Sequence, residues 1–332
     1  MENAYKLLMN TLDDLQLLDE SKHTLLINYN GGLDYFTDQQ NLTTYQPFKP
    51  LAKGDPEPLE NIPSSSVDLA LITGTKHVKE TQYYIAMAWE SLRPDGSLLI
   101  SADNKENGKR LEKWLRELTE EVQSFSGHKS RCALIQKTSQ ASNSVTDQWK
   151  EDGKIQKNPQ GFFSQPGLFS WDRIDRASEL LIQIMDEPVH GRVADFGCGY
   201  GYLSAIIQEK NPDISSLSGY DADMRAINCY EQNLSDFSKT LSTHWYDLSN
   251  YTDAQPNYDF ILMNPPFHEG RKESIFLGET FIKNAASALK NKGTLWIVAN
   301  RHLPYERTLE SCFKNIEKKG EQNGFKVYKA IK

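Results

Sequence analysis

The stretch GRVADFGCGYGYLSAIIQEK, residues 191–210, decides the fold of the second half of the chain. A short apolar run ends in Asp195-Phe-Gly197-Cys-Gly199-Tyr-Gly201, and an apolar pattern of helical period follows it. Glycines between a strand and a helix allow a tight turn and bring the backbone close to a ligand. The order of strand, glycine loop and helix indicates the start of a doubly wound α/β domain.

The sequence on both sides of this stretch continues the alternation of strands and helices. Helices are predicted at 177–185, 202–210, 224–237 and 273–293, and strands at 191–197, 216–223, 243–247, 258–267 and 294–302. Elements of these lengths in this order are typical of a sheet that is parallel at its centre and covered by helices.

The first half of the chain shows a weaker version of the same alternation of strands and helices. Residues 64–74, SSSVDLALITG, resemble the later strand PNYDFILMNP, and AMAWESLRPDGSLLISADN resembles AASALKNKGTLWIVANR. We interpret this as an internal duplication, although any two doubly wound domains share such features. The polar segment 138–167 has the composition of a linker. The 332 residues therefore predict two domains, residues 1–150 and 151–332.

Composition excludes several classes of protein. A net charge of −8 argues against a chain that coats nucleic acid, although the segment 301–332 holds eight Lys and Arg against four Glu. No apolar run approaches the roughly 20 residues of a membrane helix. The four cysteines form no Cys-x-x-Cys pair, which fits a reducing cytoplasm and no structural metal site.

The glycine loop predicts the kind of ligand. A dinucleotide fingerprint needs a glycine at position 202, which is Tyr202. Asp195 with Gly197, Gly199 and Gly201 instead resembles motif I of class I S-adenosylmethionine (SAM) methyltransferases. Asp195 could face the ammonium group of SAM, while the glycines pass its methionine and ribose parts.

Two further acids fit the same ligand. Asp221 ends the next predicted strand, where a carboxylate can accept hydrogen bonds from both ribose hydroxyls. Asp247 ends the third strand, where it would meet the adenine edge, but an acid in a solvated loop would look the same. Asp223 is expected to cap a helix.

The second chemical motif is Asn264-Pro265-Pro266-Phe267, directly after an apolar strand. The prolines stop the strand at the sheet edge where α/β proteins bind ligands. The Asn264 side-chain oxygen and the Pro265 carbonyl offer two acceptors, which suit the two N–H donors of a planar exocyclic amine. Phe267 offers a surface on which a base could stack. Such a loop serves adenine N6, guanine N2 or a glutamine amide equally well.

The wider pattern resembles the bacterial ribosomal RNA guanine-N2 methyltransferases, the RsmC type acting on 16S rRNA and the related RlmG type acting on 23S rRNA. The matching stretches are GLFSWDRID, ADFGCGYGYLS, MNPPFHEG, WIVANRHLPY and FKVYKAI. The sequence LPY favours the 16S type and ANRHL the 23S type, and we prefer the former. The family pattern has a glycine where this chain has Arg173.

This resemblance implies two tandem Rossmann-like class I methyltransferase domains, the first degenerate. Residues 30–32 and 73–75 stand there in place of the two ligand loops, so that domain would dock RNA or support the second. The resemblance implies SAM as cofactor, a cytoplasmic location, and ribosomal RNA or the small ribosomal subunit as partner. We expect a monomer with no membrane contact. The alternatives are a protein-glutamine or DNA-adenine methyltransferase, or an RNA-binding assembly module without turnover.

Overall fold

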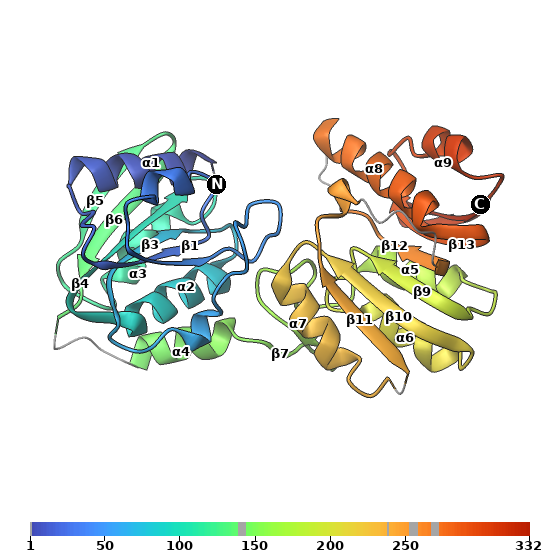
Figure 1. Cartoon of the computed structure of the whole chain (residues 1–332), viewed down its shortest axis with the longest axis horizontal. Helices are drawn as coiled ribbons and strands as arrows, with labels where there is room; N and C mark the ends of the chain where they lie inside the picture. Colours follow the sequence, from blue (N-terminus) through green and yellow to red (C-terminus); the bar gives the residue numbers. More distant parts are fainter. Residues whose placement is uncertain (1, 139–143, 238, 252–257, 267–271) are drawn as a thin grey trace. The chain divides into compact units, whose positions relative to one another are not determined.

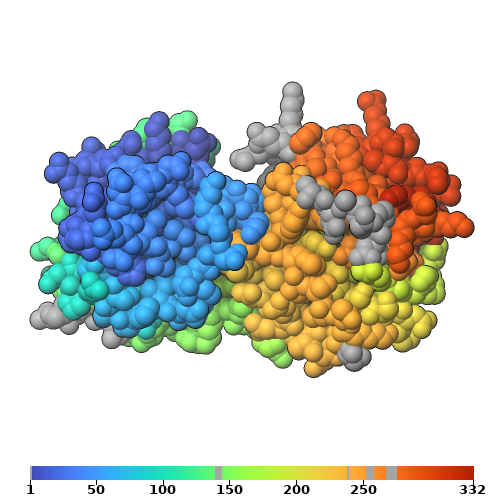
Figure 2. Space-filling model, viewed as in Figure 1, coloured from blue at the N-terminus to red at the C-terminus, as the bar shows by residue number. Residues whose placement is uncertain are grey.

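The computed structural model describes residues 2–138, 144–237, 239–251, 258–266 and 272–332, without the side chains of 272–274. The chain divides into unit 1, residues Met1–Lys154, and unit 2, residues Ile155–Lys332. Figure 1 shows one sheet with flanking helices in each unit, and Figure 2 shows their surfaces in the same colours.

The sheet of unit 2 has seven strands in the order β11-β10-β9-β12-β13-β15-β14. The pairs from β11 to β13 are parallel, whereas β15 is antiparallel to both β13 and β14. The strand bounds are β9 Gly191–Phe196, β10 Ile214–Asp221, β11 Thr240–Trp245, β12 Tyr258–Met263, β13 Leu289–Asn300, β14 Asn315–Gln322 and β15 Phe325–Ile331. The doubly wound, mostly parallel sheet predicted from the sequence is confirmed.

Helices cover both faces of this sheet (Figure 1). Apolar side chains of α5 (Arg176–Ile184), α6 (Tyr202–Lys210) and α7 (Met224–Asn233) form a core on one face. Side chains of α8 (Lys272–Ala288) and α9 (Glu306–Cys312) form a second core on the other face. Because successive residues of a strand point to opposite faces, strands buried on both sides are apolar throughout, as β12 is.

Unit 1 contains a six-stranded sheet in the order β2-β1-β3-β4-β6-β5. The strands are β1 His23–Ile27, β2 Asn41–Tyr45, β3 Val67–Thr73, β4 Leu92–Asp103, β5 Gln123–Gly127 and β6 Ser130–Gln136. One face packs against α1 (Glu2–Asp14), and the other against α2 (Val78–Ser91), α3 (Leu111–Leu115) and α4 (Ser144–Gly153). This order is that of the unit 2 sheet without its first edge strand.

The two sheets also share an irregularity in register. In unit 1, β3 and β4 slip between the pairs Val67–Leu92 and Leu69–Ser97. In unit 2, β12 and β13 slip at the matching place, between Tyr258–Leu289 and Phe260–Thr294. A shared defect of pairing is not required by the fold, so it supports the internal duplication.

The segment interpreted as a linker is partly folded. Residues 144–153 form helix α4, whose Trp149 is buried in the core of unit 1. A short hairpin follows, made of β7 (Gln156–Lys157) and β8 (Phe163–Ser164). The sequence did not predict α4 because only one face of this helix is apolar, so its composition is that of a polar linker.

Candidate active site

Three strands of unit 2 end at the same level of the sheet. Phe196 of β9 pairs with Tyr220 of β10 and with Met263 of β12. The glycine loop, Asp221 and Asn264 directly follow these three paired residues, so they meet at the carboxyl edge of the parallel strands. Ligands of open α/β sheets bind at this edge.

The glycine loop wraps around the end of β10. The backbone N–H groups of Gly197 and Cys198 donate to the Tyr220 carbonyl at 2.9 and 3.0 Å. Gly197, Gly199 and Gly201 have φ angles of 79°, 53° and 92°, which favour glycine. The loop then runs into α6, with Gly201 as its N-cap residue.

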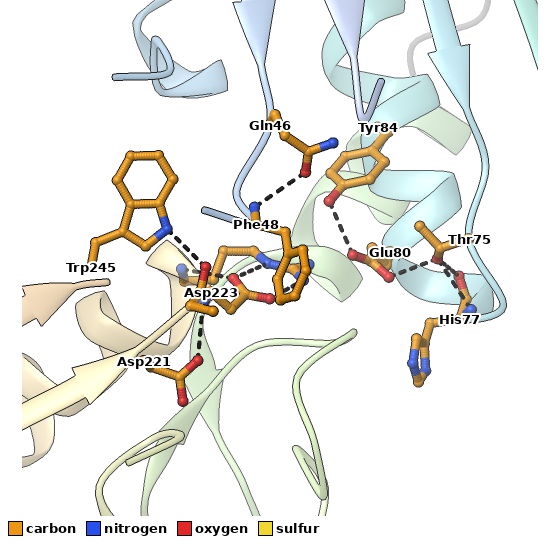
Figure 3. Close-up of polar contacts among 11 residues, drawn as sticks. Gln46, Phe48, Thr75, His77, Glu80, Tyr84, Asp221, Asp223 and Trp245 are labelled. Atoms are coloured by element: carbon orange, nitrogen blue, oxygen red, sulfur yellow. Dashed lines mark hydrogen bonds and ion pairs between the residues drawn. The ribbon is translucent and has the colours of Figure 1, made fainter. Parts of the chain in front are cut away.

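Asp221 connects the glycine loop with the next loop. Its carboxylate accepts hydrogen bonds from the backbone N–H of Gly199 and of Asp223, both at 2.9 Å. Figure 3 shows the bond between Asp221 and Asp223. Desolvation at the base of the loop raises the pKa of Asp221 to about 6. Asp223 caps α7 by accepting from Arg225 N–H, as expected from the sequence.

A pocket of about 60 Å³ opens beside this loop. Its lining comes from the glycine loop, from the start of α6, from the segment before α5 and from the end of β12: Phe169, Ser170, Asp175, Ser178, Gly197, Cys198, Gly199, Tyr200, Tyr202, Leu203 and Asn264. A larger cavity of about 280 Å³ lies at the amino edge, between the ends of α5 and α6. The smaller pocket is the better candidate because the predicted glycines and Asn264 meet there.

The side-chain amide of Asn264 is fixed by two hydrogen bonds from its nitrogen. Its Nδ2 donates to Asp175 Oδ2 and to Ser178 Oγ, both at 2.9 Å. Its Oδ1 is buried and has no hydrogen-bond partner among the described residues. A buried acceptor without a partner costs about 1–3 kcal/mol. Asn264 therefore keeps an acceptor available for a ligand.

The remaining residues of this loop are known in part. Pro265 is buried and Pro266 is exposed, and the two prolines end β12 because neither has an N–H to donate. Phe267, which we expect to stack on a base, lies outside the described residues, as does His268.

Asp195 lies beneath the loop rather than on the pocket. The side chain is fully buried, and its Oδ2 accepts from Ser204 Oγ at 2.8 Å. Tyr230 donates in turn to Ser204 Oγ at 2.9 Å. Desolvation is the main reason why the pKa of Asp195 is raised to about 7, and the nearby Asp221 adds to it. The other carboxylate oxygen, Oδ1, is also buried and has no hydrogen-bond partner among the described residues, and the expected contact with an ammonium group stays a prediction.

Asp247 caps a short turn after β11. Its Oδ1 accepts from the Ser249 backbone N–H at 2.9 Å and from the Ser249 hydroxyl at 2.6 Å, and its Oδ2 accepts from Asn250 at 2.7 Å. Nearby, Trp245 donates to the Ala222 carbonyl at 2.9 Å (Figure 3). Both oxygens of the Asp247 carboxylate thus form hydrogen bonds within this loop. A ligand would therefore contact the loop through its backbone.

The segment 167–178, which carries part of the family resemblance, forms a wall of the pocket. Phe169 is 63% exposed at the pocket, and Ser170 has a φ of 49°, a left-handed angle that is costly for a non-glycine residue. Arg173, in the place of the family's glycine, has no positive φ, so the replacement costs no backbone strain. Its carbonyl accepts from Tyr200 at 3.0 Å. The stretch GLFSWDRID was the available signal.

The basic segment 301–332 is largely paired with acids. Lys326 is buried, and its Nζ bonds to Glu306 at 2.5 Å and to the Leu303 carbonyl at 2.6 Å. Lys329 pairs with Glu187. The further pairs are Arg301–Glu321, Lys318–Glu321 and Lys319 with Asp186 and Glu317. Lys326 therefore serves the core rather than a phosphate.

The equivalent loops of unit 1 are closed by internal hydrogen bonds. The Thr73 carbonyl accepts from Asn28 Nδ2 at 2.7 Å, and the Thr75 carbonyl accepts from Asn107 Nδ2 at 2.7 Å. Thr75 also donates to Glu80, which accepts from Tyr84 as well (Figure 3). Two backbone acceptors of this loop are thus satisfied within unit 1, whereas the Thr73 hydroxyl, at the position of Asn264, is buried without a hydrogen-bond partner among the described residues.

Comparisons with known proteins identify the family of this chain. Residues 160–329 match the model of the methyltransferase small domain. The ribosomal RNA small subunit methyltransferase C of Psychromonas ingrahamii is 32% identical over 270 residues, which are 80% of this chain and 76% of the relative. The chain belongs to the ribosomal RNA small subunit methyltransferase C family. This confirms the family expected from the sequence.

Two further relatives extend the similarity over almost the whole chain. The family member of Shewanella loihica is 29% identical over 334 residues and covers 94% of both chains. The T. thermophilus 16S rRNA N2 methyltransferase (RsmC), solved in complex with AdoMet and guanosine, has a TM-score of 0.80 with 21% identity. It covers 99% of this chain and 91% of the solved chain. The shared fold thus includes both methyltransferase-like domains of this family.

Membrane spans and metal clusters are two other features that the described residues lack. Within the described part of the chain, no helix is long and apolar enough to cross a membrane. The same residues contain no cluster of three or more His, Cys, Asp or Glu side chains that could hold a metal ion.

Proposed function

We propose that this protein transfers a methyl group from SAM to the exocyclic N2 amine of a guanine in 16S ribosomal RNA. The family of the chain supports this reaction, and so does the T. thermophilus neighbour with its bound AdoMet and guanosine. The observation that carries the proposal is the buried Oδ1 of Asn264 beside the glycine loop, which has no hydrogen-bond partner in the described part of the chain. An amine that must be held and activated needs such an acceptor.

The donor site fits SAM in shape and chemistry. A Cβ on Gly199 would meet nothing within 4 Å, so the loop leaves space above its backbone. Gly197, Gly199 and Gly201 would pass the methionine and ribose parts, and Asp221 would accept from the ribose hydroxyls. The loop at Asp247 would meet the adenine. Because the pocket of about 60 Å³ holds only part of such a molecule, the rest would extend along the sheet edge.

Asp195 has a supporting role in this proposal. Its carboxylate lies fully buried under the glycine loop and bonds to Ser204 in the first turn of α6. A negative charge there would favour the positively charged cofactor without touching it. Asp195 would therefore tune the donor site rather than bind the ammonium group directly.

The acceptor site would orient the guanine amine. Asn264 Oδ1 and the Pro265 carbonyl would accept its two N–H groups and draw its nitrogen toward tetrahedral geometry, which frees the lone pair. Phe267 would stack on the base after it has left the RNA stack. SAM supplies the methyl group and the leaving group through its sulfonium. Positioning of the two substrates would thus supply most of the rate, and no side chain must act as general base before transfer.

Unit 1 would dock RNA or support unit 2 without catalysis, because residues 30–32 and 73–75 stand in place of the acid with three glycines and of the Asn-Pro-Pro-Phe loop. The partner would be the small ribosomal subunit or its RNA, in the cytoplasm. We propose a monomer, since each chain contains one complete set of donor and acceptor residues.

The test is methyl transfer from SAM to 16S RNA and to small subunits, with modified nucleosides identified by mass spectrometry. The expected product is N2-methylguanosine, and Asn264→Ala should reduce its formation at least about 100-fold while the SAM dissociation constant changes little. Methylation of 23S RNA, of DNA adenine or of a protein amide instead would reject this substrate. A chain that binds SAM and methylates none of these would be an assembly module.

A further inference from the structure

Two side chains at the start of α5 determine which way the Asn264 amide faces. Asn264 Nδ2 donates to Asp175 Oδ2 and to Ser178 Oγ, each at 2.9 Å. A carboxylate can only accept hydrogen bonds, so the amide nitrogen, not its oxygen, must face Asp175. The oxygen is thereby turned away from α5, and it is this atom that has no partner among the described residues.

Asp175 is fixed independently of Asn264. It is the N-cap residue of α5, and its Oδ2 accepts from the Ser178 backbone N–H at 2.9 Å. Ser178 is buried in the first turn of the same helix. A cap and a first-turn side chain move with their helix, so the two acceptors form a rigid platform for the amide.

The hydrogen bond to a carboxylate also changes the amide itself. A charge-assisted bond at Nδ2 shifts electron density toward Oδ1, which makes that oxygen a stronger acceptor. A substrate amine bound to Oδ1 would thus complete a series of hydrogen bonds that runs from Asp175 through the Asn264 amide to the substrate. Reversal of the amide would instead place two N–H donors against the donors of the amine.

We infer that Asp175 and Ser178 are positioning residues, which hold the Asn264 amide with its oxygen toward the substrate amine. This inference rests on the proposed function, because it assigns a task to the acceptor atom that the function requires. It predicts that loss of the two acceptors lowers turnover without weakening the binding of SAM.

The variants separate orientation from folding. Asp175→Ser keeps a good helix cap but is too short to reach Asn264, whereas Asp175→Asn keeps an oxygen for both Ser178 N–H and Asn264. Asp19→Ser is the matched control, since Asp19 also accepts from a backbone N–H in a turn but lies exposed in unit 1. Each full-length variant is assayed for kcat and KM with small subunits and for SAM affinity by calorimetry.

Asp175→Ser should lower kcat about 10- to 100-fold, with the SAM dissociation constant and the KM within about threefold of the parent. Asp175→Asn, which keeps the oxygen but not the charge, should lose less of its kcat than Asp175→Ser, and Asp19→Ser should keep kcat within about threefold of the parent. Equal losses of kcat and of SAM affinity in Asp175→Ser would make Asp175 a donor-site ligand and overturn the inference. So would a kcat like that of the control, or an Asp175→Asn as slow as Asp175→Ser.

A spectroscopic measurement keeps this test separate from the proposed reaction. The side-chain NH2 signals of Asn264, identified by their loss in Asn264→Ala, can be followed by NMR in protein with 15N-labelled asparagine. Asp175→Ser should shift them strongly and Asp19→Ser should not. Unchanged signals in Asp175→Ser overturn the inference even if the parent methylates RNA. A parent that makes no N2-methylguanosine contradicts the proposed function alone.

Discussion

Gly199 and Gly201 share a left-handed backbone but have different neighbours. A Cβ at Gly201 would lie 2.9 Å from the ring of Tyr230, whereas a Cβ at Gly199 would meet nothing within 4 Å. Packing therefore requires glycine at position 201. At position 199 the backbone angle and the space left for a ligand are the reasons for glycine.

Gly199→Ala should show both effects, a loss of stability from the backbone angle and a loss of SAM affinity from the filled space. The left-handed angle should cost about 1–2 kcal/mol of stability, and the new methyl group should weaken SAM binding at least about tenfold. Gly161→Ala is the matched control, because Gly161 has a φ of 88° and equally open surroundings, in the hairpin after β7. Thermal unfolding and calorimetry measure both quantities. Equal SAM affinity in the two variants would show that Gly199 does not border the cofactor.

Asp195 predicts an unusual dependence of stability on pH. Burial raises its pKa from 3.8 to about 7, so the folded state holds a proton that the unfolded state releases between these values. The resulting stabilisation is complete below pH 3.8 and is lost as the pH rises through 7. Between pH 5 and pH 8 this group alone should lower the free energy of unfolding by an amount on the order of 2–3 kcal/mol.

Asp195→Asn should remove this contribution, since asparagine does not titrate. Denaturant unfolding of parent and variant at pH 5, 6, 7 and 8 gives the comparison, in which other titrating groups cancel. As the pH rises, the free energy of unfolding of the parent should fall relative to that of the variant. Parallel pH profiles would mean that Asp195 is charged at pH 5 in the folded protein.

At the scale of elements, β15 is fixed to α9 by a buried cation. Lys326 is 4% exposed, and Glu306 accepts from both Lys326 Nζ and Tyr328 Oη, each at 2.5 Å. The bond from Lys326 lowers the pKa of Glu306 against the opposing effect of burial. β15 lies between β13 and β14, so this lysine is inside the sheet rather than on an edge strand.

Removal of only one partner should be worse than replacement of the cation. Glu306→Ala leaves a buried ammonium group without its carboxylate partner and should destabilise the fold by about 2–3 kcal/mol, while Lys326→Met should stay within about 1 kcal/mol of the parent. Unfolding and RNA binding at several salt concentrations measure the effects. A large loss of salt-sensitive RNA affinity in Lys326→Met would restore the phosphate contact that its burial argues against.

The sequence predicted those elements whose signal is local. The strands before the glycine loop and before Asn264 are apolar runs stopped by glycine or proline, and both loops lie where expected. The pairing of Asn264 with Asp175 was not predictable, because 89 residues separate them and Asp175 resembles an ordinary helix cap. Helix α4 was missed for a similar reason, since its single buried face is visible only against α2.

At the scale of the whole molecule, the distribution of charge bears on which unit contacts RNA. The net charge is −8, and the basic segment 301–332 is mostly paired within unit 2. Non-specific attraction of RNA to that segment is therefore weak. Under the proposed function, the surface of unit 1 would then be a candidate for a second RNA contact.

A fragment that contains unit 2 alone tests whether unit 1 contacts RNA. Each sheet has cores on both of its faces, so residues 155–332 should fold alone and bind SAM within about threefold of the full chain. If unit 1 contributes a second RNA contact, its loss removes the gain of a linked binding site, and the KM for small subunits should rise about 100-fold. Steady-state kinetics with the fragment and with the full chain measure this ratio. A fragment with unchanged KM would make unit 1 a support for unit 2 rather than an RNA-docking domain.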